Sequence, residues 1–208
     1  MIHVYCIRTD AQNVSASALE TRVASCIDTL PAAKRDRILH IRPSQARVNS
    51  ALGWCLLRFA LRDRGMGQIE VAASLVACAI TDTGRVGIDC ERLRPVNAAA
   101  LLRRILSSNQ RAPSDADARA FFRLWTQKEA VIKAEGNGGV WDMARVHTDD
   151  ATADYRGTRW HLYPVALADD YIAHVASDIA ERCITMHAVS IEQLLGDEGA
   201  RDQPAPVD

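Results

Sequence analysis

The order strand, helices, strands occurs twice along the sequence, once before about residue 85 and once after it. This repeated order constrains the fold more than any single motif. β-Branched and aromatic runs predict strands, and apolar residues spaced three and four apart predict helices. The predicted strands cover 2–8, 74–80, 85–91, 158–165, 171–177 and 183–190. The predicted helices cover 15–30, 31–42, 46–64, 98–108, 118–135 and 191–195. The pattern predicts an α+β protein.

The repeated order suggests two similar α+β halves packed side by side. A chain of 208 residues is long enough for that arrangement to enclose a sizeable core. We predict an N-terminal half over 1–85 and a C-terminal half over 86–195. The polar, Pro-containing segment 196–208 is predicted to be a disordered tail.

Composition excludes several classes of function. The net charge of −1 gives no overall attraction to nucleic acid or membranes. The N-terminus lacks the pattern of a signal peptide, and no apolar run is long enough to span a membrane. The six cysteines form no CxxC pair and the six histidines are dispersed, so no zinc spacing is visible. We therefore expect a cytoplasmic protein with reduced, mostly buried thiols.

The stretch VGIDCERLRP carries two acids separated by one residue, Asp89 and Glu91. In a strand both side chains project from one face, while Ile88 and Cys90 turn to the core. Neighbouring carboxylates repel each other unless a cation lies between them, and carboxylates are typical ligands of Mg²⁺. The alternative is the end of a strand with two solvated acids.

The helical segment WTQKEAVIK places Glu129 and Lys133 one turn apart, with Lys128 adjacent. Glu129 could be a third metal carboxylate, and the lysines could meet phosphate charge. The alternative is an ordinary surface ion pair. A second basic stretch, AKRDRILHIR, contains Lys34 and Arg37; it could hold a phosphate or could form a solvated helix face.

Taken in order, VGIDCE and FFRLWTQKEAVIKAEGNG resemble the two signature motifs of 4′-phosphopantetheinyl transferases of the surfactin-synthetase-activating type. Three further stretches resemble other parts of that family: MIHVYCIRTD its first strand, KRDRILHI its basic helix and ITMHAVSIEQLL its ending. The resemblance implies a pseudo-duplicated fold with the active site in the cleft between the halves. It also implies a monomer.

The resemblance implies Mg²⁺-dependent transfer of the 4′-phosphopantetheine arm of coenzyme A to a serine of an acyl or peptidyl carrier protein, with release of 3′,5′-ADP. Asp89, Glu91 and Glu129 would be the metal ligands, and Glu129 would also be the base for the serine. Lys133, assisted by Lys128, would neutralise the pyrophosphate. Lys34 and Arg37 would hold the 3′-phosphate.

The chain departs from the family in two places. Between Arg64 and VGIDCE the family has a G-K-P loop and an S-H-S segment that contact coenzyme A, and this shorter connection has neither. Gln110 stands where many members carry glutamate. If the pyrophosphate site is intact, we expect the loss of these two binding elements to raise KM more than it lowers kcat. Two other functions stay open: a non-catalytic relative that binds carrier protein or coenzyme A, and a Mg²⁺ phosphotransfer enzyme with another substrate.

Overall fold

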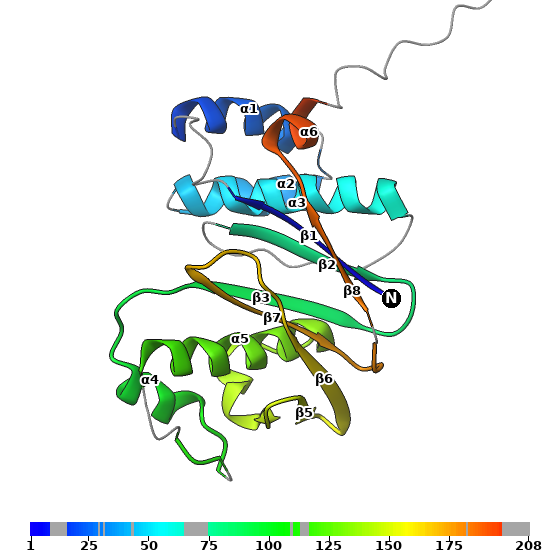
Figure 1. Ribbon diagram of the computed structural model, residues 1–208. Coiled ribbons are helices and arrows are strands. Elements are labelled where there is room, and N and C mark those ends of the chain that lie inside the picture. The colour runs from blue at the N-terminus through cyan, green and yellow to red at the C-terminus, as the bar shows by residue number, and fades with distance from the viewer. Residues whose placement is uncertain are drawn as a thin grey trace, which may run out of the picture.

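The computed structural model describes residues 1–8, 16–28, 30, 32–42, 44–64, 75–108, 110–112, 117–181 and 183–196. These residues form four layers, in which two sheets lie face to face and helices cover both outer sides (Figure 1). The α+β class predicted from the sequence is confirmed. The internal duplication stays a prediction.

The first sheet has the strand order β2-β1-β8. Its strands are β1 (Ile2–Arg8), β2 (Leu75–Thr81) and β8 (Ile184–Ala188). β1 pairs antiparallel with β2 and parallel with β8. Its outer face is covered by α1 (Ala16–Asp28), α2 (Ala32–Leu39), α3 (Ser44–Arg64) and α6 (Ile191–Gly196). The longest of these, α3, contributes Leu52 and Leu56 to the core below it.

The second sheet is antiparallel, with the strand order β3-β7-β6-β5-β4. Its strands are β3 (Val86–Arg92), β4 (His147–Thr148), β5 (Thr152–Tyr155), β6 (Thr158–Pro164) and β7 (Tyr171–Ser177). Its outer face is covered by α4 (Ala98–Ile105), α5 (Ala118–Glu135) and the 3-10 helix η1 (Val140–Arg145). These helices and this sheet carry the candidate site.

A third apolar cluster lies between the two sheets, where Ile2 and Val4 of β1 meet Ile88 and Cys90 of β3. Side chains alternate along a strand, so turning Ile88 and Cys90 inward sends Asp89 and Glu91 to the opposite face, against α5. The prediction that Cys90 faces the core is confirmed. Burial in this cluster raises the pKa of the Cys90 thiol, which keeps it protonated and inert.

Most predicted elements are present, and Asn97 caps α4 by accepting a hydrogen bond from the backbone N–H of Ala100 at 3.2 Å. The prediction missed β4, β5 and η1, which are too short for a periodic pattern. It also assigned 86–195 to one half, whereas β8 pairs with β1 and α6 packs on the first sheet. The connection over 65–74 and the predicted tail beyond Gly196 lie outside the described residues. Within the described ranges, no helix is long and apolar enough to cross a membrane.

Candidate active site

Strand β3 lies directly on the backbone of α5, and Gly87 makes this close approach possible. A Cβ atom at position 87 would come within 2.4 Å of the Ala130 carbonyl oxygen and 2.5 Å of the Ala134 nitrogen. Any larger residue would therefore push the strand and helix apart. The glycine of the GIDCE stretch thus brings the acid that follows it within reach of α5.

The ends of α5 are fixed by local sequence. Asp117 caps the start by accepting from the backbone N–H of Ala120 at 2.7 Å, and Gly136 ends the helix in the left-handed conformation, φ 87°. The helix therefore spans the whole WTQKEAVIK motif and sets the directions of its side chains.

Asp89 and Lys133 form the central contact of the site. Lys133 Nζ donates to Asp89 Oδ1 at 3.0 Å, and the two side chains are only 17% and 7% exposed. Within the described part of the chain, the other oxygen, Asp89 Oδ2, is buried and accepts no hydrogen bond. A buried carboxylate oxygen in that state has capacity for a further cation or donor.

Glu91 and Glu129 lie beside this pair on the same two elements. Glu91 accepts from Arg94 Nη1 at 2.8 Å, and the Arg94 guanidinium also lies over the Phe122 ring, 4.6 Å from its centroid. Glu129 is buried on α5, one turn before Lys133. The sequence interpretation missed Arg94, although its position three residues after Glu91 could have indicated the ion pair.

The carboxylates suit Mg²⁺ in donor type, and the buried Asp89 Oδ2 has capacity for a cation. Over the residues described, however, no three His, Cys, Asp or Glu side chains are grouped so that they could hold a metal ion. Arg94 and Lys133 are the cations that contact Glu91 and Asp89. The assignment of Asp89, Glu91 and Glu129 as ligands stays a prediction, and Glu91 Oε2 pairs with Arg94 in the structure.

Lys128 does not lie with these groups, which corrects its predicted place at the pyrophosphate. It is fully buried, and its Nζ donates to Gln110 Oε1 at 2.7 Å, Met143 O at 3.0 Å and Val146 O at 2.6 Å. None of these partners belongs to β3. Burial lowers the pKa of Lys128 to about 8. This lysine ties α5 to η1 and to the segment after α4.

Lys34 and Arg37 lie on α2, in the helical layer on the other side of both sheets from α5 (Figure 1). Arg37 is exposed, and Lys34 Nζ lies 4.7 Å from the centroid of the Trp54 ring. The structure does not bring these cations together with Asp89 and Lys133. Their role toward a 3′-phosphate stays a prediction.

A buried histidine lies next to Asp89 and was not singled out from the sequence. His174 of β7 is the cross-strand partner of Asp89, and its Nδ1 lies 2.7 Å from Thr126 Oγ1 on α5. Burial lowers the pKa of His174 to about 4, so the ring is neutral at pH 7. Its alternation within YIAHVAS could have indicated that it shares a face with Ile172.

Residues 85–176, which contain β3, α5 and all of β7 except Ser177, match the model of the 4′-phosphopantetheinyl transferase superfamily. This segment is therefore similar to that superfamily, and the resemblance predicted from the two motifs is confirmed for it. The surfactin-synthetase-activating subclass stays a prediction.

Among curated proteins, the chain is 37% identical over 119 residues to the 4′-phosphopantetheinyl transferase HetI of Nostoc sp., which covers 52% of this chain and 50% of HetI. It is 35% identical over 85 residues to the 4′-phosphopantetheinyl transferase AcpT of Salmonella typhi, covering 38% of this chain and 44% of AcpT. The match to AcpT of Escherichia coli covers 77 residues at 35% identity, or 34% of this chain and 39% of that protein. The chain thus spans half or less of the length of the relatives that it matches.

Proposed function

We propose that the protein is a 4′-phosphopantetheinyl transferase that moves the phosphopantetheine arm of coenzyme A to a serine of an acyl or peptidyl carrier protein. The observation that carries the proposal is the Asp89–Lys133 pair, which lies within the segment that matches the superfamily, with Glu129 on the same helix. The names of the relatives support the same reaction class.

In the proposed reaction, the serine hydroxyl attacks the phosphorus that carries the pantetheine arm. Glu129 accepts the serine proton, because serine is a weak nucleophile near neutral pH. The bond between that phosphorus and the bridging oxygen breaks, and the electron pair leaves with 3′,5′-ADP. Lys133 donates to the pyrophosphate oxygens, where its ammonium offsets the charge that develops on the leaving phosphate.

Mg²⁺ would be held by Asp89, Glu91 and Glu129, and when bound it would neutralise pyrophosphate charge. Lys133, whose side chain is 17% exposed, would contact the phosphates from its place beside Asp89. In this proposal, the protein's own residues position the anionic substrate, and Glu129 accepts the serine proton.

The proposal is tested by incubating the protein with coenzyme A, Mg²⁺ and a panel of apo carrier proteins, and by recording the mass of each carrier. We expect a gain of one phosphopantetheine group on at least one carrier, and loss of that gain in Glu129→Gln. Glu135→Gln is the matched control, because Glu135 lies on the same helix but pairs with Arg156.

Two outcomes would contradict the proposal: no mass gain on any carrier, or full activity in Glu129→Gln. Calorimetry with coenzyme A then identifies the alternative. Binding of coenzyme A without transfer would indicate a non-catalytic relative. Binding of Mg²⁺ without coenzyme A would indicate a phosphotransfer enzyme with another substrate.

A further inference from the structure

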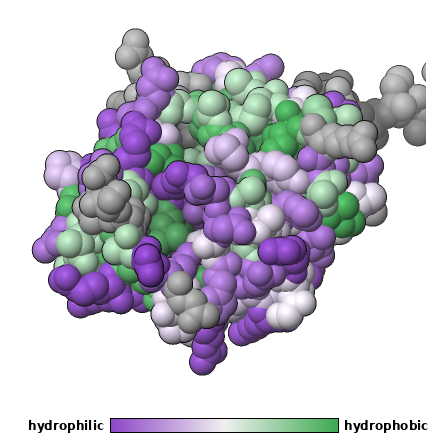
Figure 2. Space-filling model, turned by 60° about the horizontal axis from the view of Figure 1, so that its bottom comes forward, coloured by the Kyte–Doolittle hydropathy of each residue, from purple (hydrophilic) through white to green (hydrophobic). Residues whose placement is uncertain are grey.

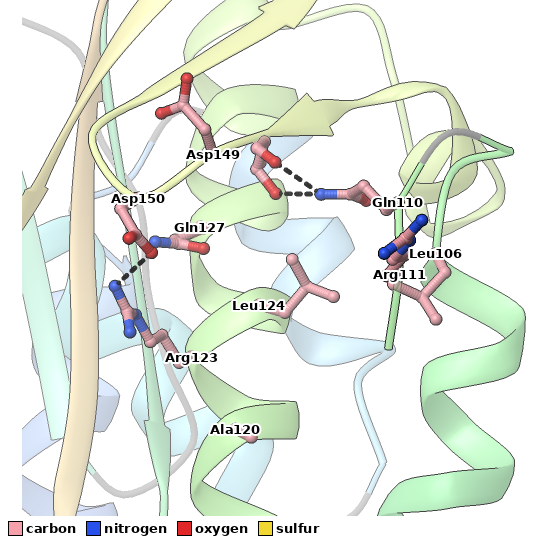
Figure 3. Close-up of a pocket in the computed structure, with 10 residues that line it drawn as sticks. Leu106, Gln110, Arg111, Ala120, Arg123, Leu124, Gln127, Asp149 and Asp150 are labelled. Atoms are coloured by element: carbon pink, nitrogen blue, oxygen red, sulfur yellow. Dashed lines mark hydrogen bonds and ion pairs between the residues drawn. The ribbon is translucent and has the colours of Figure 1, made fainter. Parts of the chain in front are cut away.

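Polar contacts without histidine change little between about pH 5 and 8, because histidine is the side chain that ordinarily titrates in this range. On the face that α4 and α5 form, hydrophilic side chains border hollows with apolar surface (Figure 2). In a pocket on this face, Arg123 pairs with Asp150 and Gln110 donates to Thr148, both without histidine (Figure 3). The first sheet, in contrast, holds a contact between two histidines.

His3 of β1 and His187 of β8 contact each other on the side of the first sheet that the helices cover. Tyr5, two residues after His3 on the same face, packs in the cluster beneath these helices. His3 Nδ1 lies 3.1 Å from His187 Nε2, and the ring centroids are 5.4 Å apart. At this distance one nitrogen donates its proton to the lone pair of the other. This histidine pair therefore ties the side chains of the two strands together.

The histidine pair lies on an edge strand. In the order β2-β1-β8, and within the described part of the chain, β8 is paired with β1 alone. Helix α6 follows β8 and buries Ile191 and Leu194 in the core of the first sheet. Because an edge strand has backbone partners on one side only, a side-chain contact to that partner contributes directly to holding it. The pair therefore acts on the attachment of β8 and of the helix that follows it.

The ring of His187 is held in place by Tyr5. The two rings stack with 4.3 Å between their centroids and 12° between their planes, and Tyr5 is only 1% exposed. The Tyr5 hydroxyl in turn donates to Asp63 Oδ2 at the end of α3. Rotation of His187 away from His3 would break the stack, so the pair cannot accommodate a second proton by that rotation without losing a packing contact.

The charged groups around the pair make a proton on His3 unfavourable. Burial lowers the pKa of His3 most, followed by the guanidinium of Arg64 on α3, by His187 and by the N-terminal amine. Asp82, which follows β2, acts in the opposite direction. His187 has a carboxylate nearby, because the pKa of Asp63 is lowered first by the tyrosine hydroxyl and then by the charges of Arg64 and His187. A first proton on the pair is therefore favoured on His187, and a second proton on His3 is opposed.

We propose that the histidine pair is a pH-sensitive switch that holds β8 and α6 on the first sheet near neutral pH and loosens them as the pH falls. With no added proton, or with one, an N–H group of one ring still points at a lone pair of the other. With two, both facing nitrogens carry N–H groups and the rings repel each other as like charges. A chain in which β8 is released therefore binds the second proton more readily, and acidification below about pH 6.5 favours release.

Hydrogen exchange of the β8 amides at about pH 7.5 and about pH 5 tests the switch, with each rate corrected for the intrinsic effect of pH. We expect the protection of the β8 amides to fall by about tenfold between the two conditions, against less than about twofold for the β6 amides. His187→Gln, which keeps a hydrogen-bonding side chain without a titratable ring, should abolish the difference. Equal protection of β8 at both pH values in the wild type, or an undiminished fall in His187→Gln, would overturn the proposal.

Titration of the wild type examines the pair without any substitution. The ring nitrogen signals in NMR spectra should show coupled titration, in which His3 gains its proton below its ordinary pKa and its signals respond to the protonation of His187. Titration of each ring independently of the other would overturn the proposal.

His174→Gln is the control, because His174 is a buried histidine of the second sheet whose pKa of about 4 also makes stability depend on pH. We expect the fall in β8 protection to persist in this variant. Its disappearance would assign the effect to His174 and overturn the proposal. All of these measurements use the full chain without coenzyme A, so their outcome does not depend on the proposed transferase function.

Discussion

Lys128 and Lys133 come from one motif and one helix, yet the structure gives them opposite surroundings. Five residues apart, they point about 140° from each other around α5. Lys133 is partly exposed and donates to a carboxylate, Asp89. Lys128 is fully buried and donates to three neutral oxygens, one of them Oε1 of Gln110. Lys133 is therefore a cation that a substrate can reach, whereas Lys128 holds α5, η1 and the segment after α4 together.

This contrast shows that a residue's place in a motif does not determine its role. The side of α5 that faces β3 carries acids and a lysine with capacity for further partners. On the side that faces η1, the Lys128 ammonium can bind no further acceptor, because its three N–H groups already donate to three oxygens. Substitutions on the two sides should therefore affect different properties: activity on the first and stability on the second.

The largest effect is expected for Asp89→Asn. This change keeps the shape of the side chain but removes the charge that holds Lys133 and that we assign to the metal. We expect kcat for transfer to a carrier protein to fall by about 10²–10³-fold. The free energy of unfolding should fall little, since Lys133 can reach solvent. Asp154→Asn, at an exposed position on β5, is the control; wild-type activity in Asp89→Asn would contradict the assignment.

The pH dependence of stability tests whether His174, on the side of α5 that faces the sheet, must stay uncharged in the folded protein. Its pKa is about 4 in the folded protein against 6.5 ordinarily, so the unfolded chain binds the proton first as the pH falls. Stability is full above pH 6.5 and decreases down to pH 4, by roughly 3 kcal/mol. Urea unfolding across this range should show the decrease, and His174→Gln should remove this part of it. An unchanged pH dependence in the variant would contradict the prediction.

Much of the fold and part of the site could be predicted from local sequence. Periodicity located α5 and β3, and the alternation of GIDCE placed Asp89 and Glu91 on one face, because these features depend only on near neighbours. Lys128 could not be placed in this way, since its three acceptors lie 15 to 18 residues away along the chain. The pairing of β8 with β1 was missed for the same reason: it joins residues about 180 positions apart.

Lys128→Met should show the reverse of Asp89→Asn. It removes the common donor of Gln110 Oε1, Met143 O and Val146 O. Gln110 Oε1 still accepts from Ser107 and Met143 O still accepts from the Val146 N–H, so the cost of an unsatisfied acceptor, about 1–3 kcal/mol, falls on Val146 O. Relief from burying an ammonium offsets part of that cost. We expect a net loss of about 2 kcal/mol in the free energy of unfolding, measured in urea at pH 7. The kcat of the folded protein should stay near that of the wild type; loss of kcat with unchanged stability would place Lys128 in the active site after all.

Gln110→Glu should change the free energy of unfolding least. It also tests the difference between the two lysines most directly, because it gives Lys128 a carboxylate partner like the one that Lys133 already has. The new charge should raise the pKa of Lys128 above about 8, measured by NMR titration of its side chain. The free energy of unfolding at pH 7 should change by no more than about 1 kcal/mol, since the glutamate loses the donor to Thr148.

The size of the increase in stability with pH distinguishes the wild type from Gln110→Glu. In the wild type, Lys128 loses its proton near pH 8 when folded but near 10.5 when unfolded, so its contribution to stability increases between those values. In Gln110→Glu the two pKa values approach each other, and that increase should shrink or vanish. If the increase persists unchanged, the new carboxylate does not offset the burial of Lys128, and the distinction between the two lysines would rest on burial alone.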